Sequence, residues 1–149
     1  MASPQTFSAQ VSEWVRQTEN RMEMVFKASS QEVFSRAQTP KAQGGNLPVD
    51  TGNLRNTFVA GLNGTTSLTG PDAYIAAIAG SQLGDRITGG WTAEYAPRME
   101  FGFVGQDSLG RTYNQEGNGF VRKAVMDWQS IVTEMSNRAK AISRSVLLM

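Results

Sequence analysis

Residues 4–36 read PQTFSAQVSEWVRQTENRMEMVFKASSQEVFSR, and this stretch decides how the rest of the chain is interpreted. Its apolar residues recur at steps of three and four, the pattern of an amphipathic helix. They are Phe7, Val11, Trp14, Val15, Met22, Val25, Phe26 and Val33. Ser3 suits the cap and Pro4 the first helical position, so we predict a helix from Pro4 to Arg36. Such a helix spans roughly 50 Å, so part of its stripe is expected to pack on a neighbouring subunit.

A second apolar stripe lies in the C-terminal part of the chain and predicts another helix, from Phe120 to Arg144. Its members are Val121, Val125, Trp128, Val132, Met135, Ala139 and Ile142. Asn118 or Gly119 is expected to start this helix. The cations near its end suit the negative pole of the helix dipole.

Four large apolar features are assigned by their positions. Trp14 and Trp128 fall on the two stripes, so both rings are expected in the core. Trp91 follows two glycines in an expected loop, so it is the aromatic side chain we single out as an interface anchor. The C-terminal tail is expected to dock on the core or on a partner, because free termini are rarely so apolar. The tail consists of Val146, Leu147, Leu148 and Met149.

The segment between the two helices predicts a small antiparallel sheet with long loops. Strands are predicted at 57–62 and 73–79, and loops or turns at 39–49, 63–72 and 82–90. Residues 94–101 are expected to begin extended before Pro97 and then to make one helical turn, which Gly102 ends in a left-handed conformation. Residues 103–117 form either an exposed hairpin or a long loop. The predicted fold is therefore α+β, with both long helices packed on the sheet.

Length and composition narrow the classes of function. The chain of 149 residues is expected to form one domain, residues 1–149. Its net charge of +1, from 14 basic and 13 acidic residues, gives no global attraction to nucleic acid or membranes. The absence of cysteine and histidine excludes disulfides, Cys/His zinc sites and a Ser-His-Asp triad. Neither a signal peptide nor a membrane span is expected, so the protein should be soluble.

Carboxylates and cations remain as candidates for chemistry. A carboxylate cluster could bind Mg²⁺ or act as an acid/base pair, but surface charges and helix caps are the favoured interpretation. That cluster would be Glu94, Glu100, Asp107 and Glu116. Arg55 and Arg98 are equally compatible with ion pairs across a subunit boundary and with solvation. The cations of the last helix could touch DNA, although a solvated face is favoured. They are Arg122, Lys123, Arg138, Lys140 and Arg144.

Three short motifs follow one another in the last two-thirds of the chain. Residues 47–55 read LPVDTGNLR, residues 95–102 read YAPRMEFG, and residues 119–125 read GFVRKAV. In this order, with a helix on each side, they resemble the phage neck and tail-completion proteins related to gene product ten of the Hong Kong ninety-seven type siphophage. The resemblance extends from Leu47 to the C-terminus. It departs at Arg122-Lys123-Ala124, where such motifs often have Arg-Pro-Ala.

The resemblance implies a non-enzymatic virion protein that forms a ring at the head–tail junction, as a neck, tail-completion or tail-terminator protein. The implied partners are other copies of the chain, head-side connector proteins, tail tube or terminator proteins, and the genome DNA, contacted weakly and without sequence preference. No membrane partner, cofactor, metal or catalytic residue is expected. Synthesis in the bacterial host cytoplasm and residence in the virion follow. The alternatives are a small nucleic-acid-binding domain that uses the basic C-terminal helix, and a metal-dependent hydrolase that uses Glu94, Glu100 and Glu116.

The physical chemistry of the motif residues fits structural roles. We expect Asp50 or Thr51 to cap a short helical turn, Gly52 to permit a close approach, and Leu54 to fill the core. Tyr95 and Phe101 are expected to bury their rings. The carboxylate of Glu100 is expected to accept a hydrogen bond from a backbone amide or from an arginine, either Arg55 or Arg122. The remaining motif residues are Gly102 and Phe120.

Overall fold

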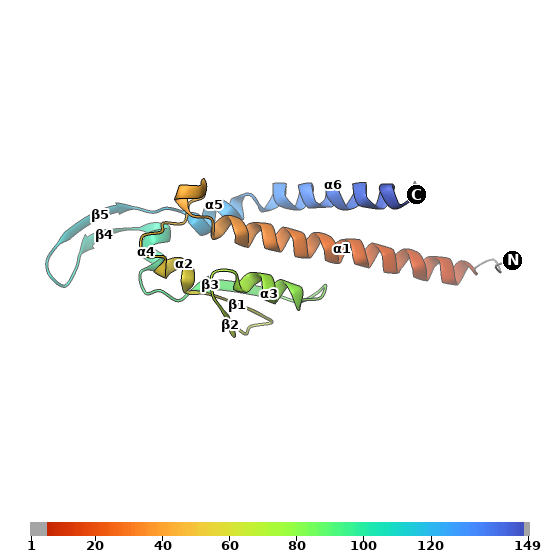
Figure 1. Cartoon of the computed structure of the whole chain (residues 1–149), viewed down its shortest axis with the longest axis horizontal. Coiled ribbons are helices and arrows are strands. Elements are labelled where there is room, and N and C mark those ends of the chain that lie inside the picture. Colours follow the sequence, from red (N-terminus) through yellow and green to blue (C-terminus); the bar gives the residue numbers. More distant parts are fainter. Residues whose placement is uncertain (1–5, 148–149) are drawn as a thin grey trace.

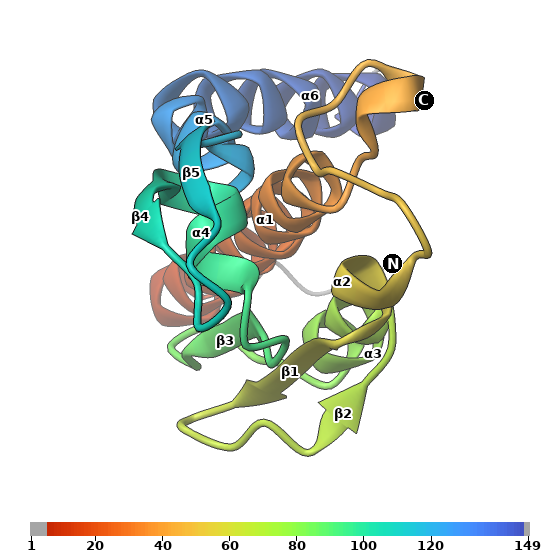
Figure 2. The ribbon, with the colours of Figure 1, turned by 90° about the vertical axis from the view of Figure 1, so that its left-hand side faces the viewer.

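Two antiparallel helices form the spine of the molecule. The computed structural model describes residues 6–147, with side chains up to Arg144. Helix α1 (Phe7–Ala37) runs the length of the body, and α6 (Trp128–Leu147) returns beside it, so both ends of the described chain lie at one end of the molecule (Figure 1). Viewed along this axis, α1 lies between α6 and a layer made of a small sheet and helix α3 (Figure 2). The predicted α+β class is confirmed. The two long helices pack against each other, however, and α6 lies on the side of α1 away from the sheet, so α6 does not pack on the sheet as predicted (Figure 2).

Helix α1 confirms the first predicted helix but begins later. The side chain of Thr6 caps it by accepting a hydrogen bond of 3.1 Å from the Ala9 amide. The predicted capping residues, Ser3 and Pro4, lie outside the described residues. The helix ends at Ala37, shortly before Pro40, whose ring disfavours helical residues ahead of it.

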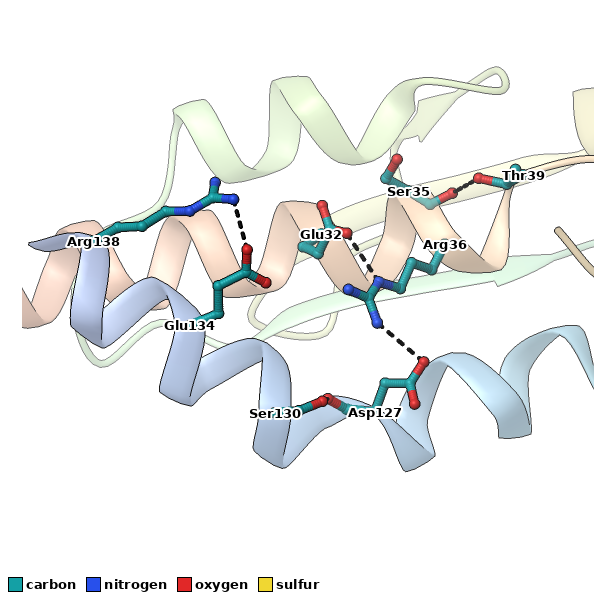
Figure 3. A network of polar contacts seen from close by, with 8 residues as sticks. All are labelled: Glu32, Ser35, Arg36, Thr39, Asp127, Ser130, Glu134 and Arg138. Carbon is teal, nitrogen blue, oxygen red and sulfur yellow. Dashed lines mark hydrogen bonds and ion pairs between the residues drawn. The ribbon is translucent and has the colours of Figure 1, made fainter. Parts of the chain in front are cut away.

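The second predicted helix is interrupted at one residue. Gly119 precedes α5 (Phe120–Met126), as predicted, but Asp127 separates α5 from α6. The Asp127 carboxylate lies 3.0 Å from Nη1 of Arg36, whose Nε lies 2.9 Å from Glu32 (Figure 3). Arg36 therefore ties the junction between α5 and α6 to the last turns of α1. Aspartate is a weak helix former, so the break between α5 and α6 falls at a residue that favours it, and the ion pair lies at this break.

The three-stranded sheet has the order β2-β1-β3 and is antiparallel throughout. Its strands are β1 (Phe58–Leu62), β2 (Leu68–Thr69) and β3 (Ile87–Trp91). The prediction for 57–62 is confirmed. Residues 68–69, predicted to lie in a turn region, and residues 87–91, predicted as loop, form the two edge strands. The segment predicted as a strand at 73–79 is helix α3 (Ala73–Ala79). Its alanine-rich sequence favours a helix, and its buried residues share one helical face against β1 and α1.

The core consists of two clusters joined by one indole. The first comprises Phe58, Ala60, Ala73, Tyr74, Ala77 and Ile78. The second comprises Leu47, Leu54, Ala96 and Phe120. The ring of Trp91 meets Phe58 at 5.2 Å and Phe120 at 4.9 Å between centroids, both edge-to-face. Trp91 is thus a strand residue between the two clusters, and its predicted place in a loop was wrong.

A two-stranded hairpin leaves the body at the end opposite the chain termini (Figure 1). It consists of β4 (Gly102–Gln106) and β5 (Thr112–Glu116), so of the two alternatives for residues 103–117 the structure shows the hairpin. Three short helices connect the remaining segments: η1 (Lys41–Gln43), α2 (Asn53–Asn56) and α4 (Ala96–Phe101). Helix α4 includes Pro97 in its first turn, so the predicted extended start before Pro97 was wrong.

Candidate functional site

The three sequence motifs meet in the second core cluster. The first motif supplies Leu47 and Leu54, the second supplies Ala96, and the third supplies Phe120. Leu54 is 4% exposed and Phe120 is 1% exposed, so the predicted core role of Leu54 is confirmed. The motif residues therefore pack against one another in the core, at the place where α2, α4 and α5 join the body.

Glu100 fastens the second motif to the third. Its carboxylate, on the largely buried face of α4, accepts hydrogen bonds of 2.9 Å from the backbone amides of Val121 and Arg122. These amides belong to the first turn of α5, where no intrahelical acceptor is available. A negative charge is also favourable at a helix N-terminus. The expected hydrogen bond from a backbone amide is confirmed, whereas neither arginine side chain supplies it: Nε of Arg55 donates to the Gln38 carbonyl.

The first motif is built differently from the prediction. Asp50 and Thr51 are exposed and do not cap α2. The residue before α2 is Gly52, whose φ of +82° is a conformation that favours glycine. A Cβ at this position would make only ordinary contact, 3.5 Å from Nδ2 of Asn56. Gly52 is therefore required for its backbone conformation and not for a close approach.

The second motif presents its aromatic side chains outward. Tyr95 is 38% exposed and Phe101 is 79% exposed, so the predicted burial of both rings was wrong. Tyr95 Oη accepts a hydrogen bond of 3.0 Å from Asn53. Gly102 does turn the chain, with a φ of +85° but an extended ψ of 176°, a region open almost only to glycine. A Cβ there would lie 2.4 Å from the Gln115 carbonyl oxygen, so Gly102 also allows β5 to approach.

Gln38 is a structural residue that no sequence pattern singles out. It is 2% exposed, and its Nε2 donates to the carbonyls of Arg55, at 3.2 Å, and Pro71, at 2.9 Å. Its Oε1 accepts a hydrogen bond of 2.8 Å from the indole of Trp91. One amide thus joins the end of α1 to α2, to the turn before α3, and to β3. In the sequence, a glutamine at a helix end looks like a residue with a solvated side chain. Only the tertiary fold shows that the side chain of Gln38 is buried.

The carboxylates considered for catalysis do not converge. Glu100 is occupied by backbone amides, and Asp107 holds the turn of the hairpin. Within residues 6–147, no group of three or more acidic side chains is placed to hold a metal ion. The hydrogen bond from the Arg111 amide, opposed by burial and reinforced by the Arg111 guanidinium, holds the pKa of Asp107 below its ordinary value.

The prominent surface feature is exposed apolar area at both ends of the molecule. At the end that holds the chain termini, Phe7 and Trp14 of α1 are 81% and 63% exposed. Trp128, at the opposite end of α6, is 40% exposed. The prediction that both tryptophans lie in the core was therefore wrong. At the other end, Val104 and Leu109 of the hairpin are 77% and 76% exposed.

The hairpin is ordered by specific contacts although it stands alone. The guanidinium of Arg98 lies 4.0 Å from the centre of the Phe103 ring, and Phe103 packs against Tyr113. At the turn, the Asp107 carboxylate accepts hydrogen bonds from the amides of Leu109 and Arg111. These contacts hold the exposed side chain of Leu109 at a fixed tip.

The predicted docking of the C-terminal tail concerns side chains outside the described residues. Leu147 ends α6, but its side chain, together with Leu148 and Met149, lies outside the described part of the chain. The long helices that the structure describes include none with the length and apolarity of a membrane span. No protein-family model matches the sequence, and neither a curated protein nor a solved structure shows significant similarity to the chain.

Proposed function

We propose that this chain is a structural protein of a tailed-phage virion and forms an oligomeric ring at the head–tail junction. Its level in the junction is that of a neck, tail-completion or tail-terminator protein, linking the portal-side connector to the tail tube around the DNA channel. The resemblance carried by the three motifs suggests this role. The geometry that supports it is that of a rigid scaffold that presents apolar surface.

The projecting hairpin is the observation that carries the proposal. An isolated two-stranded hairpin is at best marginally stable in water. Here it is anchored by Gly102 at its base and by two hydrogen bonds from Asn118 to the Met99 carbonyl, at 2.8 and 2.9 Å. It nevertheless leaves Val104 and Leu109 in solvent. An ordered arm with uncovered apolar side chains suits a protein that grips a neighbour.

The motif residues support a structural protein more than an enzyme. The buried carboxylate, Glu100, is engaged in holding two helices together, and Asp107 is engaged in the hairpin turn. Both carboxylates are occupied by hydrogen bonds from backbone amides, whereas general acid–base catalysis requires a group that is free to exchange a proton with a substrate. The motifs thus maintain the scaffold. The surfaces left for function are the hairpin and the free part of α1, that is, its first turns, which reach past the end of α6 (Figure 1).

The proposed partners follow from this assignment. They are other copies of the chain, connector proteins on the head side, and tube or terminator proteins on the tail side. Genome DNA in the channel would be contacted weakly, and the net charge of +1 suits a wall that does not retain DNA. The protein would be made in the bacterial host cytoplasm and carried in the virion.

Electron microscopy of intact virions and purified head–tail junctions tests the proposal. We expect a ring of this chain between portal and tail tube, with the hairpins in contact with neighbouring chains. Particles that lack the chain would overturn the proposal. Tight, salt-dependent binding of the isolated protein to DNA, combined with absence from the particle, would favour the nucleic-acid-binding alternative.

A further inference from the structure

We infer that the groove between α1 and α6 receives the first turns of α1 from a second copy of the chain. The inference rests on the proposed ring and assigns its subunit contact to the helical pair. Under this assignment, the hairpin arm remains available for the proteins above and below.

The acceptor is an apolar groove of about 480 Å³ along the helical pair. Its apolar walls are Met22, Val25 and Phe26 of α1 and Trp128, Val132 and Ala139 of α6. By comparison, an engineered apolar cavity of about 150 Å³ binds a benzene molecule. The groove is therefore large enough for aromatic side chains. Nothing in the described part of the chain fills it.

The donor is the part of α1 that continues beyond its own partner helix. Figure 1 shows the first turns of α1 reaching past the end of α6. These turns carry Phe7, Val11 and Trp14, which are 81%, 42% and 63% exposed. Their spacing places all three on one side of the helix, in line with the side chains that wall the groove. The same stripe thus supplies an uncovered ridge at one end and one wall of an open groove at the other.

The exposed area matches what a subunit contact needs. Phe7 and Trp14, at about 150–250 Å² for a whole aromatic side chain and with their exposures of 81% and 63%, present roughly 200–350 Å². Val11 and Val15 extend this face, since each is at least 40% exposed. The apolar part of one side of a standard interface is about 450 Å². The stripe alone therefore provides most of the apolar area of a stable contact.

Charge also fits this pairing. Arg21 and Lys140 line the groove, and neither forms an ion pair with any residue whose side chain is described. Glu19, near the donor turns, likewise has no ion pair in this range. A neighbouring copy seated in the groove would bring its Glu19 toward these cations, which favours a fixed orientation.

The contact joins two different surfaces of the same chain, so it is heterologous. Each copy then offers its α1 ridge to one neighbour and its groove to the other. Such head-to-tail contacts generate a ring when the rotation closes. This is the symmetry that the proposed function requires.

Cysteine cross-linking tests the contact cleanly, because the chain contains no cysteine. Particles are assembled with a chain carrying Val11→Cys and Ser136→Cys, treated with a short bismaleimide and analysed on denaturing gels. We expect a ladder of dimers, trimers and larger species. Each single variant should remain monomeric. Val11→Cys combined with Thr133→Cys, on the outer side of α6, is the matched control and should give no ladder.

The outcomes separate this inference from the proposed function. A ring seen by microscopy without a ladder, or with products that stop at dimers, overturns the inference and leaves the function standing. As a second measurement, Trp14→Glu should weaken self-association roughly thirtyfold, the loss expected for an aromatic hot spot. Ile75→Glu, on a helix face that is 46% exposed at that residue, should leave association unchanged. Equal association of both variants would overturn the inference.

Discussion

Replacement of Glu100 by glutamine tests the contact that joins α4 to α5. In the structure each carboxylate oxygen accepts one backbone amide at 2.9 Å, from Val121 and from Arg122. Glutamine has the same shape but only one acceptor oxygen. Its NH₂ group would face the second backbone N–H, so one amide of the first turn of α5 would lose its partner.

The expected cost follows from these two lost interactions. A buried donor left unsatisfied costs about 1–3 kcal/mol, and the loss of a negative charge at a helix N-terminus costs about 0.3–1 kcal/mol. We therefore expect Glu100→Gln to lower the free energy of unfolding by about 2–3 kcal/mol. For a chain of this length that corresponds to a decrease in Tm of roughly 5–10 °C.

Thermal unfolding followed by circular dichroism measures this effect, with Glu116→Gln as the control at an exposed position on β5. The control should melt with the wild type. Hydrogen exchange adds a local readout, because the amides of Val121 and Arg122 should exchange faster in the Glu100 variant. A Glu100→Gln protein with an unchanged Tm and unchanged exchange at these amides would refute the reasoning. The contact would then hold no part of the fold together.

Three further changes test other parts of the fold. Gln38→Leu leaves two carbonyls and an indole N–H unpaired and should cost about 2–4 kcal/mol in urea unfolding; an unchanged midpoint would contradict the role of this amide as a junction. Gly89→Ala would place a Cβ 2.5 Å from a core ring carbon and should cost about 1–3 kcal/mol by thermal unfolding, whereas Gly90→Ala, which meets nothing within 4 Å, should be nearly neutral. If the two alanine variants melt alike, the packing argument at β3 fails. Because the Arg111 amide keeps the pKa of Asp107 low, the hairpin turn should be held above about pH 4 and should loosen as acid protonates this carboxylate; hydrogen exchange at the turn that does not change with acid would contradict this.

The sequence predicts the long helices well, because their apolar periodicity is sustained over many turns. The stripe from Phe7 to Val33 fixes both the helix and its apolar face. Short elements are harder to predict. Residues 73–79 are apolar without interruption, so periodicity cannot separate a buried strand from a buried helix. Residues 87–91 contain two glycines and resemble a loop, yet Gly89 is needed there because the rings of Phe34 and Phe58 occupy the place of its Cβ.

The burial of individual side chains is also hard to predict from the sequence. An apolar stripe identifies the face that needs cover, but it does not say whether the same chain provides that cover. Trp14 and Trp128 belong to such stripes and remain 63% and 40% exposed in the single chain. The role of Gln38 was missed for the opposite reason, because a buried amide has no sequence pattern of its own. The role of Glu100 was predictable in part, because the first backbone amides of a helix lack intrahelical acceptors and a carboxylate can accept hydrogen bonds from them.

The residues that carry the resemblance and the residues that would carry the function occupy different parts of the molecule. Leu54 and Phe120 are inside, and Glu100 connects the elements around them. Leu109 at the hairpin tip and Trp14 on the free part of α1 lie outside the motifs and face solvent. The motifs therefore specify a way of holding a hairpin and a long helix in fixed positions. If the proposed function holds, the choice of partner would come from the side chains on those two elements, and changes there would alter partners without a large cost in folding stability.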